Sequence, residues 1–355
     1  MKRLLTLCLA AALLAACGAP ASSPAADSAT STASTQEAAP TTAPTPEPTP
    51  EATPTPEPTV APVTLDSWRS AGQNPAAEYS ITDSTYDSGL LEGAVWPESV
   101  TLLANWNGSL EEMAETFGVA VETLQQLNPA PETADDGNGG TWYFDMQIQD
   151  GPYTLPQTAL KRVEIVVPWA SDPGEQSHSV IVPASLDDQA AAALAEAEWF
   201  LYHSEVSVGY WPAEVTDETN MVYRSKEGAR FTTFSGFTTF LQSVFTDEKA
   251  QAYAGGGLNE YGYYSGFFAG EDDSLCFASG DRGTNIYYAG TAYTEPETLE
   301  DGSIRFLQLS LQVSEEDFGG WGTGEEIQPA LAYATEVRLV PTEGGWRVAA
   351  LSLPQ

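Results

Sequence analysis

Residues 109–129 read SLEEMAETFGVAVETLQQLNP, and this stretch decides the first part of the fold. Its first half carries apolar residues at the spacing of one helix face, namely Leu110, Met113, Ala114 and Phe117. Ser109 followed by Glu112 is a capping-box signature, which satisfies free backbone N–H groups where a helix begins. Gly118 suits the left-handed conformation in which many helices end. The pattern predicts a short amphipathic helix over 110–117.

A second short helix is expected within the same stretch. Its apolar residues recur every three positions, and they are Val121, Leu124 and Leu127. Asn128 and Pro129 end the pattern, because proline cannot continue a helix. The β-branched and apolar runs on either side, Val100–Trp106 and Arg162–Pro168, predict strands. We therefore expect the order strand, helix, helix, strand.

This stretch and its expected order resemble the LysM module. The residues that match the family pattern in spacing are Ser109-Leu110, Met113-Ala114, Phe117-Gly118, Val121, Leu124 and Leu127-Asn128-Pro129. The departures are Asn107-Gly108 for the usual Gly-Asp, Ala120 for the Ser/Thr cap of the second helix, Ala130–Thr158 for a short loop, and Arg162-Val163 for the closing Gly-Gln. The resemblance implies a small βααβ module over residues 100–170 with an insertion.

LysM modules bind glycans that contain N-acetylglucosamine, such as peptidoglycan and chitin, in a groove between two loops. Carried over by position, the resemblance implies a glycan-binding groove formed by Trp106, Asn107, Gly108, Ser109, Leu127, Asn128 and Pro129. A sugar ring packs well on an aromatic face such as that of Trp106. The alternative is that Trp106 and Asn128 only close the small core and cap a helix.

The N-terminus carries a different signature. Lys2 and Arg3 precede an apolar run from Leu4 to Ala16, which is shorter than the roughly 20 residues that span a bilayer. A basic start, an apolar middle and small residues before a cleavage site describe a signal peptide. The ending Leu-Ala-Ala-Cys-Gly resembles the signal of bacterial lipoproteins, which implies lipidation of Cys17. We expect a cell-membrane protein, lipid-anchored on the outer, extracytoplasmic face and facing the cell wall; the alternative is an ordinary secretion signal.

Residues 1–16 are therefore the expected lipoprotein signal peptide, and residues 17–62 are expected to be a disordered tether. The tether is rich in Pro, Thr, Ser and Ala and has no aromatic residue, so it lacks the apolar surface that a packed core needs. Proline-rich segments are extended and semi-rigid, so the tether would hold the folded part away from the membrane. For residues 63–99 the sequence predicts no role.

Composition limits the function classes. The chain has 13 Lys and Arg against 50 Asp and Glu, a formal net charge of −37. Nucleic acid is not expected as a partner, because its phosphates would be repelled. The charge favours cations or basic proteins, and solubility alone is the plain alternative. Cys276 is the single thiol besides Cys17 after signal removal, and its apolar run, Ser274–Ala278, predicts a buried small hydrophobe.

Residues 185–355 predict a second α+β domain, with helices packed on a curved antiparallel sheet. The expected helices are 185–203, with a cap at Ser185–Asp188, then 237–245 and 246–254. In the run Leu307–Val313, Leu or Val alternates with Gln308, Ser310 and Gln312, which predicts a half-buried strand with its polar side chains toward solvent. The other expected strands are Ile286–Tyr293 and a terminal hairpin around Glu343–Gly345.

Three short pieces of this domain, SVFTDEKAQAY, GDRGTNIYY and GGWRVAALSLP, are similar to secreted proteins around the IseA-type inhibitor of DL-endopeptidase autolysins. The surrounding pattern also resembles the nuclear-transport-factor-2-like cone fold. The first resemblance implies a protein that inhibits a cell-wall hydrolase, and the second implies a pocket for a small ligand. Asp281 and Arg282, in the polar cluster Gly280–Gly283, are the candidate partner-binding residues; the alternative for them is a turn with a local ion pair.

No catalytic motif stands out, so we expect no catalytic residue, cofactor or metal. The histidines are His178, in the polar loop Gly174–Ser179, and His203, at a helix end where a cation suits the helix dipole. The run Asp135–Gly139 lacks the closing Glu of a calcium loop and predicts an exposed turn. We expect a lipid-anchored protein that binds peptidoglycan and regulates a wall hydrolase. The alternatives are a small-ligand sensor with a cone-fold pocket and an unrecognised hydrolase.

Overall fold

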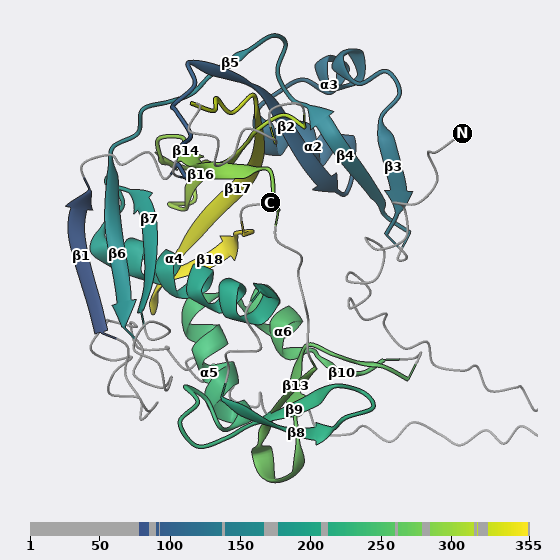
Figure 1. Cartoon of the computed structure of the whole chain (residues 1–355), viewed down its shortest axis with the longest axis vertical. Helices are drawn as coiled ribbons and strands as arrows, with labels where there is room; N and C mark the ends of the chain where they lie inside the picture. Colours follow the sequence, from purple (N-terminus) through teal and green to yellow (C-terminus); the bar gives the residue numbers. More distant parts are fainter. Residues whose placement is uncertain are drawn as a thin grey trace, which may run out of the picture.

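The computed structural model describes residues 78–84, 90–91, 93–136, 139–166, 177–206, 212–259, 262–278, 285–315, 318 and 326–353. This part of the chain is a mixed α+β structure in which strands outnumber helices (Figure 1). The expected signal peptide and tether lie outside it. Within the described ranges, no helix is long and apolar enough to cross a membrane.

The unit around residues 109–129 forms as the sequence predicts. Strand β2 (Ser99–Asn107) leads to helices α2 (Leu110–Phe117) and α3 (Val121–Leu127), and the hairpin of β3 (Glu132–Asp135) and β4 (Thr141–Gln147) follows. Ser109 and Glu112 form the capping box: the Ser109 Oγ accepts from the Glu112 N–H at 3.2 Å, and the Glu112 carboxylate accepts from the Ser109 N–H at 2.9 Å. Gly118, with φ 65°, ends α2 in the left-handed conformation.

The strand that closes this unit is not the one expected. The run Arg162–Pro168 does contribute a strand, β6 (Leu160–Val166), but β6 pairs with β1 (Glu78–Ser84) and β7 (Ser177–Pro183) in a three-stranded sheet. Strand β2 pairs antiparallel with β4 instead, within the segment interpreted as an insertion. The physical reason is burial: β4 brings Tyr143 and Met146 to the core that α2 and α3 cover.

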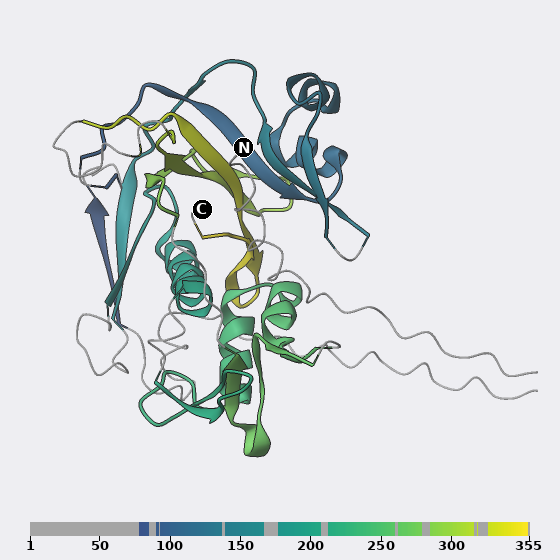
Figure 2. The ribbon, with the colours of Figure 1, turned by 45° about the vertical axis from the view of Figure 1, so that its right-hand side comes forward.

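A nine-stranded sheet connects this unit with the C-terminal strands. Its main path is β14-β16-β17-β2-β4-β3, in which the β17–β2 pair is parallel and the other neighbours are antiparallel. Its C-terminal members are β14 (Tyr288–Tyr293), β16 (Ile304–Gln312), β17 (Leu331–Thr342) and β18 (Gly345–Ala350). Figures 1 and 2 show these strands curving above α4. The βααβ unit and the C-terminal strands therefore share one sheet.

The three helices expected in the second part are confirmed within a few residues. They are α4 (Asp188–Leu201), α5 (Phe234–Val244) and α6 (Asp247–Ala254). Helix α4 begins after Asp187, whose carboxylate accepts from the Ala190 N–H at 2.8 Å. It runs on into a π-helical turn, Tyr202–Val206. Thr233 caps α5 by accepting from the Gly236 N–H at 3.2 Å.

Strand β16 separates two hydrophobic cores. Leu309 belongs to the core of the βααβ unit, and Phe306 belongs to the larger core around α4 and α5. Because side chains alternate along a strand, Gln308, Ser310 and Gln312 share the face of Phe306. The expectation that these three face solvent is wrong: they are 2%, 3% and 8% exposed. Both faces of β16 are covered, and its polar face looks toward α4.

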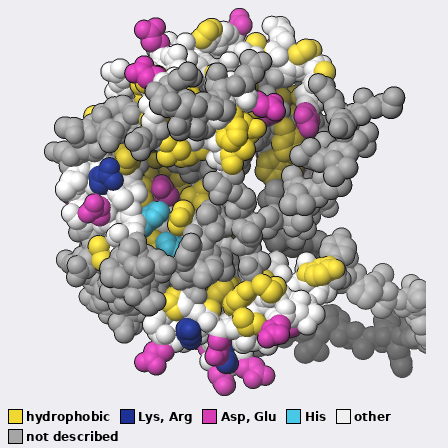
Figure 3. All heavy atoms as spheres, viewed as in Figure 1, with side chains coloured by type: hydrophobic (Ala, Val, Ile, Leu, Met, Phe, Trp, Pro, Cys, Tyr) yellow, Lys and Arg dark blue, Asp and Glu magenta, His cyan; other side chains and the backbone are white. Residues whose placement is uncertain are grey.

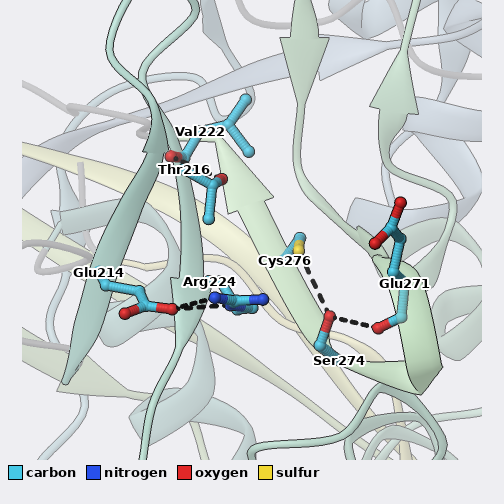
Figure 4. Close-up of polar contacts among 7 residues, drawn as sticks. All are labelled: Glu214, Thr216, Val222, Arg224, Glu271, Ser274 and Cys276. Atoms are coloured by element: carbon cyan, nitrogen blue, oxygen red, sulfur yellow. Dashed lines mark hydrogen bonds and ion pairs between the residues drawn. The ribbon is translucent and has the colours of Figure 1, made fainter.

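A smaller four-stranded sheet, in the order β12-β13-β9-β8, packs against α5 and α6. Its strands are β8 (Ala213–Asp217), β9 (Val222–Ser225), β12 (Phe267–Ala269) and β13 (Leu275–Ala278). Figure 4 shows Arg224 bonded to Glu214, and Ser274 between Glu271 and Cys276. Cys276 is 7% exposed, as the interpretation of a small buried hydrophobe requires. The two-residue strands are β5 (Tyr153–Thr154), β10 (Gly257–Leu258), β11 (Tyr264–Ser265) and β15 (Glu297–Thr298).

Candidate functional site

Polar residues from four elements meet where the last turns of α4 face the sheets. They are His178 on β7, Glu198 on α4, Tyr288 and Tyr293 on β14, and Gln308 on β16. Helix α4 is rich in alanine, and many of its alanines are fully buried, so the helix lies close against β6, β7 and β18. This close packing fixes the position of the Glu198 side chain relative to β7. We call the five residues the Glu198 pocket.

The contact between His178 and Glu198 lies at the centre of this group. The His178 Nε2 atom is 3.9 Å from a Glu198 carboxylate oxygen, and the two side chains are 17% and 19% exposed. The His178 ring centroid also lies 5.4 Å from that of Tyr202 and 6.1 Å from that of His203. The sequence suggested a loop for His178, but the residue lies in β7, opposite Ile165 of β6. Strand pairing therefore holds the imidazole in place.

Burial sets the protonation of these groups. It lowers the pKa of His178 to about 4 and that of His203 to about 4, and it raises the pKa of Glu198 to about 7. At neutral pH both rings are uncharged, and Glu198 is divided between acid and carboxylate. The expectation of a cationic His203 at the helix end is therefore wrong. Its ring is buried, and the Nδ1 atom lies 2.8 Å from the Trp199 carbonyl oxygen.

Strand β14 supplies two phenol groups to the pocket. The Tyr288 hydroxyl lies 2.7 Å from Thr291 Oγ1, and the Gln308 Nε2 donates to the Tyr293 hydroxyl at 3.5 Å. Burial raises the pKa of Tyr288 and Tyr293, and the charge of Glu198 raises both further.

Two buried atoms of the pocket have no hydrogen-bond partner within the described part of the chain. They are His178 Nε2 and Gln308 Oε1, and Gln308 is 2% exposed. Buried polar atoms are nearly always paired, so such exceptions need a physical reason, of which an absent bound group is one. Figure 3 shows histidine and acidic side chains in a hollow of the molecular surface, beside hydrophobic side chains.

A buried ion pair, Arg230–Glu196, belongs to the core around α4 and α5. Arg230 donates two hydrogen bonds of 2.8 Å to Glu196, and the two side chains are 1% and 5% exposed. The Arg230 guanidinium also lies 4.5 Å from the Trp199 ring centre and 4.9 Å from that of Phe240. The two charges compensate each other, so this pair adds no net charge to the Glu198 pocket.

Comparisons with known proteins add no assignment to this site. Neither a family model, nor a curated protein, nor a solved structure matches the chain. The role of the Glu198 pocket has to be inferred from its geometry alone. Sequence reasoning missed the pocket, although β16 carries a signal: in a chain so rich in Asp and Glu, its polar face has Gln and Ser where an exposed strand would carry charge.

The first group of expected glycan-binding residues, Trp106 to Ser109, covers the end of β2 and the turn into α2. Trp106 Nε1 donates to the Ser109 carbonyl oxygen at 3.0 Å, and the Trp106 ring packs edge-on against Phe117 at 6.0 Å between centroids. Gly108 has φ 141°, and a Cβ there would lie 2.8 Å from a Glu112 oxygen. Trp106 and Gly108 thus shape the loop, while the Asn107 side chain is exposed.

The second group, Leu127 to Pro129, ends α3. The Asn128 Nδ2 donates to the carbonyl oxygens of Leu124 at 2.8 Å and Gln147 at 2.9 Å, and its Oδ1 accepts from the Gln147 N–H at 2.9 Å. Both N–H groups of Asn128 are therefore used in joining α3 to β4. Leu127 is half-buried, and Pro129 is exposed. A ligand at these loops would meet Asn107, Pro129 and the backbone first.

The remaining candidates lie outside the described residues: Cys17, Asp281 and Arg282. The same holds for Gly137 and Asn138 in the middle of the Asp135–Gly139 run. Among the residues that are described, no three His, Cys, Asp or Glu side chains are grouped so as to hold a metal ion.

Proposed function

We propose that this chain is a lipid-anchored, extracytoplasmic binding protein whose Glu198 pocket holds a small polar molecule. One observation carries the proposal: among the described residues the buried Gln308 Oε1 and His178 Nε2 have no hydrogen-bond partner, and His178 Nε2 lies 3.9 Å from the Glu198 carboxylate. A ligand with N–H or O–H groups would supply the missing bonds, and leaving such atoms unpaired costs stability. An aromatic lining with a few convergent polar groups is typical of small-molecule sites.

Fragment screening by ligand-observed NMR on the mature full chain tests this proposal. Gln308→Leu keeps the approximate size of the side chain and removes the unpaired oxygen, and Gln251→Leu makes the same change at an exposed position of α6. We expect fragments that bind the parent to bind the Gln251→Leu variant equally and the Gln308→Leu variant about tenfold more weakly. The proposal fails if no fragment binds, or if the fragments bind the Gln308→Leu variant as tightly as the parent.

A second function, binding to peptidoglycan, is favoured by the βααβ unit. The order strand, helix, helix in β2, α2 and α3 is the one that the LysM resemblance implies, and β4, which follows β3, pairs antiparallel with β2 in place of the expected closing strand. The exposed Asn107 and Pro129 stand at the two loops that would form the groove. In this proposal the unit holds the protein on the cell wall, and the C-terminal part inhibits a wall hydrolase.

Sedimentation with insoluble peptidoglycan separates the two functions. We expect the mature chain to sediment, and an Asn107→Ala/Pro129→Ala variant to stay in solution, because these side chains are exposed and their loss leaves the fold intact. The Gln308→Leu variant should sediment with peptidoglycan as the parent does, because Gln308 is not part of the proposed groove. Zymography of the chain with and without an autolysin then distinguishes inhibition from hydrolysis. If the parent chain does not sediment, wall binding through this unit is ruled out.

A further inference from the structure

We propose that the Glu198 pocket recognises an organic ammonium group, held by the Glu198 carboxylate and Gln308 Oε1 beside the rings of His178, Tyr288 and Tyr293. This inference rests on the proposed binding function of the pocket and names the chemistry of its ligand. It is argued from the charges that face the pocket, from the kind of atom left unpaired, and from the aromatic lining.

The charges of the described residues disfavour an anionic ligand. The buried guanidinium of Arg230 is compensated by two hydrogen bonds to Glu196. Lys161, on β6, bonds to the Leu186 carbonyl oxygen and to Asp188. An anion would therefore meet the carboxyl of Glu198 without a free cation to balance it, and burying unpaired like charges is costly.

The unpaired atoms call for hydrogen-bond donors. Gln308 Oε1 is an acceptor without a donor among the described residues, and the contact of the Glu198 carboxylate with His178 Nε2 is 3.9 Å long, beyond hydrogen-bond distance. A carboxylate accepts several donors, and a primary ammonium group offers three. Charge-assisted hydrogen bonds of this kind are shorter and stronger than neutral ones. An ammonium group thus fits the pocket's unsatisfied atoms better than a neutral acceptor does.

The aromatic rings supply the remaining surface. The His178 and Tyr202 rings are 5.4 Å apart, and the phenols of Tyr288 and Tyr293 lie near enough to Glu198 to be affected by its charge. Aromatic faces attract cations within about 6 Å. The formal net charge of −37 adds a long-range attraction for cations.

Ammonium binding has to displace a proton from Glu198, because burial raises the pKa of that carboxyl to about 7. The titratable groups that interact with Glu198 are His178 on β7 and Tyr288 and Tyr293 on β14, and the His203 ring lies 6.1 Å from that of His178. Both histidines have pKa values of about 4, and the phenols titrate above pH 10, so none of these changes charge near neutrality. Affinity for an amine should therefore fall about tenfold for each pH unit below about 7.

Calorimetry with matched probes tests the inference on the mature full chain. The probes are small alkyl and benzyl amines, each paired with the alcohol of the same shape. We expect the amines to bind about tenfold more tightly than their alcohols, and to release a proton on binding at about pH 6.5. Glu198→Gln should remove this preference and the proton release. Glu164→Gln, the same change at an exposed position of β6, should keep both.

Three outcomes overturn the inference. Alcohols that bind as tightly as their amines, or a Glu198→Gln variant that still prefers amines, show that charge is not recognised, although the pocket itself would remain a binding site. If no amine binds, the ammonium inference is equally wrong, and neutral fragments from the NMR screen then decide whether the pocket binds any ligand. Thermal melting of each variant shows that a lost preference does not come from unfolding.

Discussion

His178 Nε2 and a carboxylate oxygen of Glu198 lie 3.9 Å apart across the space between β7 and α4. In water at neutral pH such residues would be a partly charged imidazole and a carboxylate. Burial moves both pKa values toward the neutral forms, to about 4 for His178 and about 7 for Glu198. At neutral pH the fold therefore leaves the imidazole uncharged and the carboxyl divided between acid and carboxylate, which makes its stability depend on pH in two opposite ways.

Replacing Glu198 with glutamine should stabilise the protein at alkaline pH. The folded-state pKa of Glu198 is about 7, above its ordinary value of 4.5. Between these values the folded state holds a proton that the unfolded state has lost, so the free energy of unfolding falls as pH rises through this window. Glu198→Gln removes this loss, and we expect a gain of up to about 3 kcal/mol at pH 8 that vanishes below about pH 4.

Urea unfolding followed from about pH 4 to 8 measures this gain. Glu164→Gln, on the exposed face of β6, is the control and should change the free energy of unfolding by less than about 0.5 kcal/mol at every pH. A Glu198→Gln variant whose stability stays parallel to that of the parent over the whole range would contradict the raised pKa.

His178 should act in the opposite direction. Its folded-state pKa of about 4 lies below the ordinary value of 6.5. Between these values the unfolded state binds the proton that the folded state excludes, so stability is complete above about pH 6.5 and is lost as pH falls toward 4. The slope of the unfolding free energy against pH measures how many more protons the unfolded state binds than the folded state. In this window His178→Leu should lower that difference by about one proton. The same urea series gives this slope, and an unchanged slope would mean that His178 is accessible to protons in the folded state.

The local elements of this fold follow from the sequence, whereas the pairing of its strands does not. The capping box of Ser109 and Glu112 and the left-handed Gly118 form as expected because they depend on neighbours within one helical turn. The partner of β2 depends instead on which strand completes a core. Tyr143 and Met146 of β4 do so, and the more regular run of β6 finds its partners in β1 and β7.

The candidate site could not be predicted from the sequence for the same reason, because it depends on tertiary packing. Glu198 and Gln308 are far apart in the chain, and only tertiary packing brings both to act on Tyr293. The alternation in β16 correctly separates two faces, but it cannot say that the face of Gln308 is covered as well. Periodicity reports which residues share a face, and burial of that face is a tertiary property.

Asn128 should matter for stability more than its expected role in glycan binding suggests. Its carboxamide makes three hydrogen bonds, to Leu124 and to both backbone groups of Gln147. Asn128→Ala leaves these backbone groups without their partner, so we expect a loss of about 2–4 kcal/mol in the free energy of unfolding. Asn107→Ala, at an exposed position, should cost less than about 0.5 kcal/mol. Equal and small effects would show that Asn128 is dispensable for joining α3 to β4.

The Arg230–Glu196 pair permits a stricter test of the core beside the pocket. Arg230→Met leaves the Glu196 carboxylate buried without its guanidinium, and removal of one partner of such a pair costs about 3–5 kcal/mol. The double variant Arg230→Met/Glu196→Leu removes both charges and fills similar volume, so it should regain most of that loss. Urea unfolding of the parent, the two single variants and the double variant completes the cycle. A double variant no more stable than Arg230→Met would show that the pair stabilises the core through its packing on Trp199 and Phe240 rather than through charge compensation.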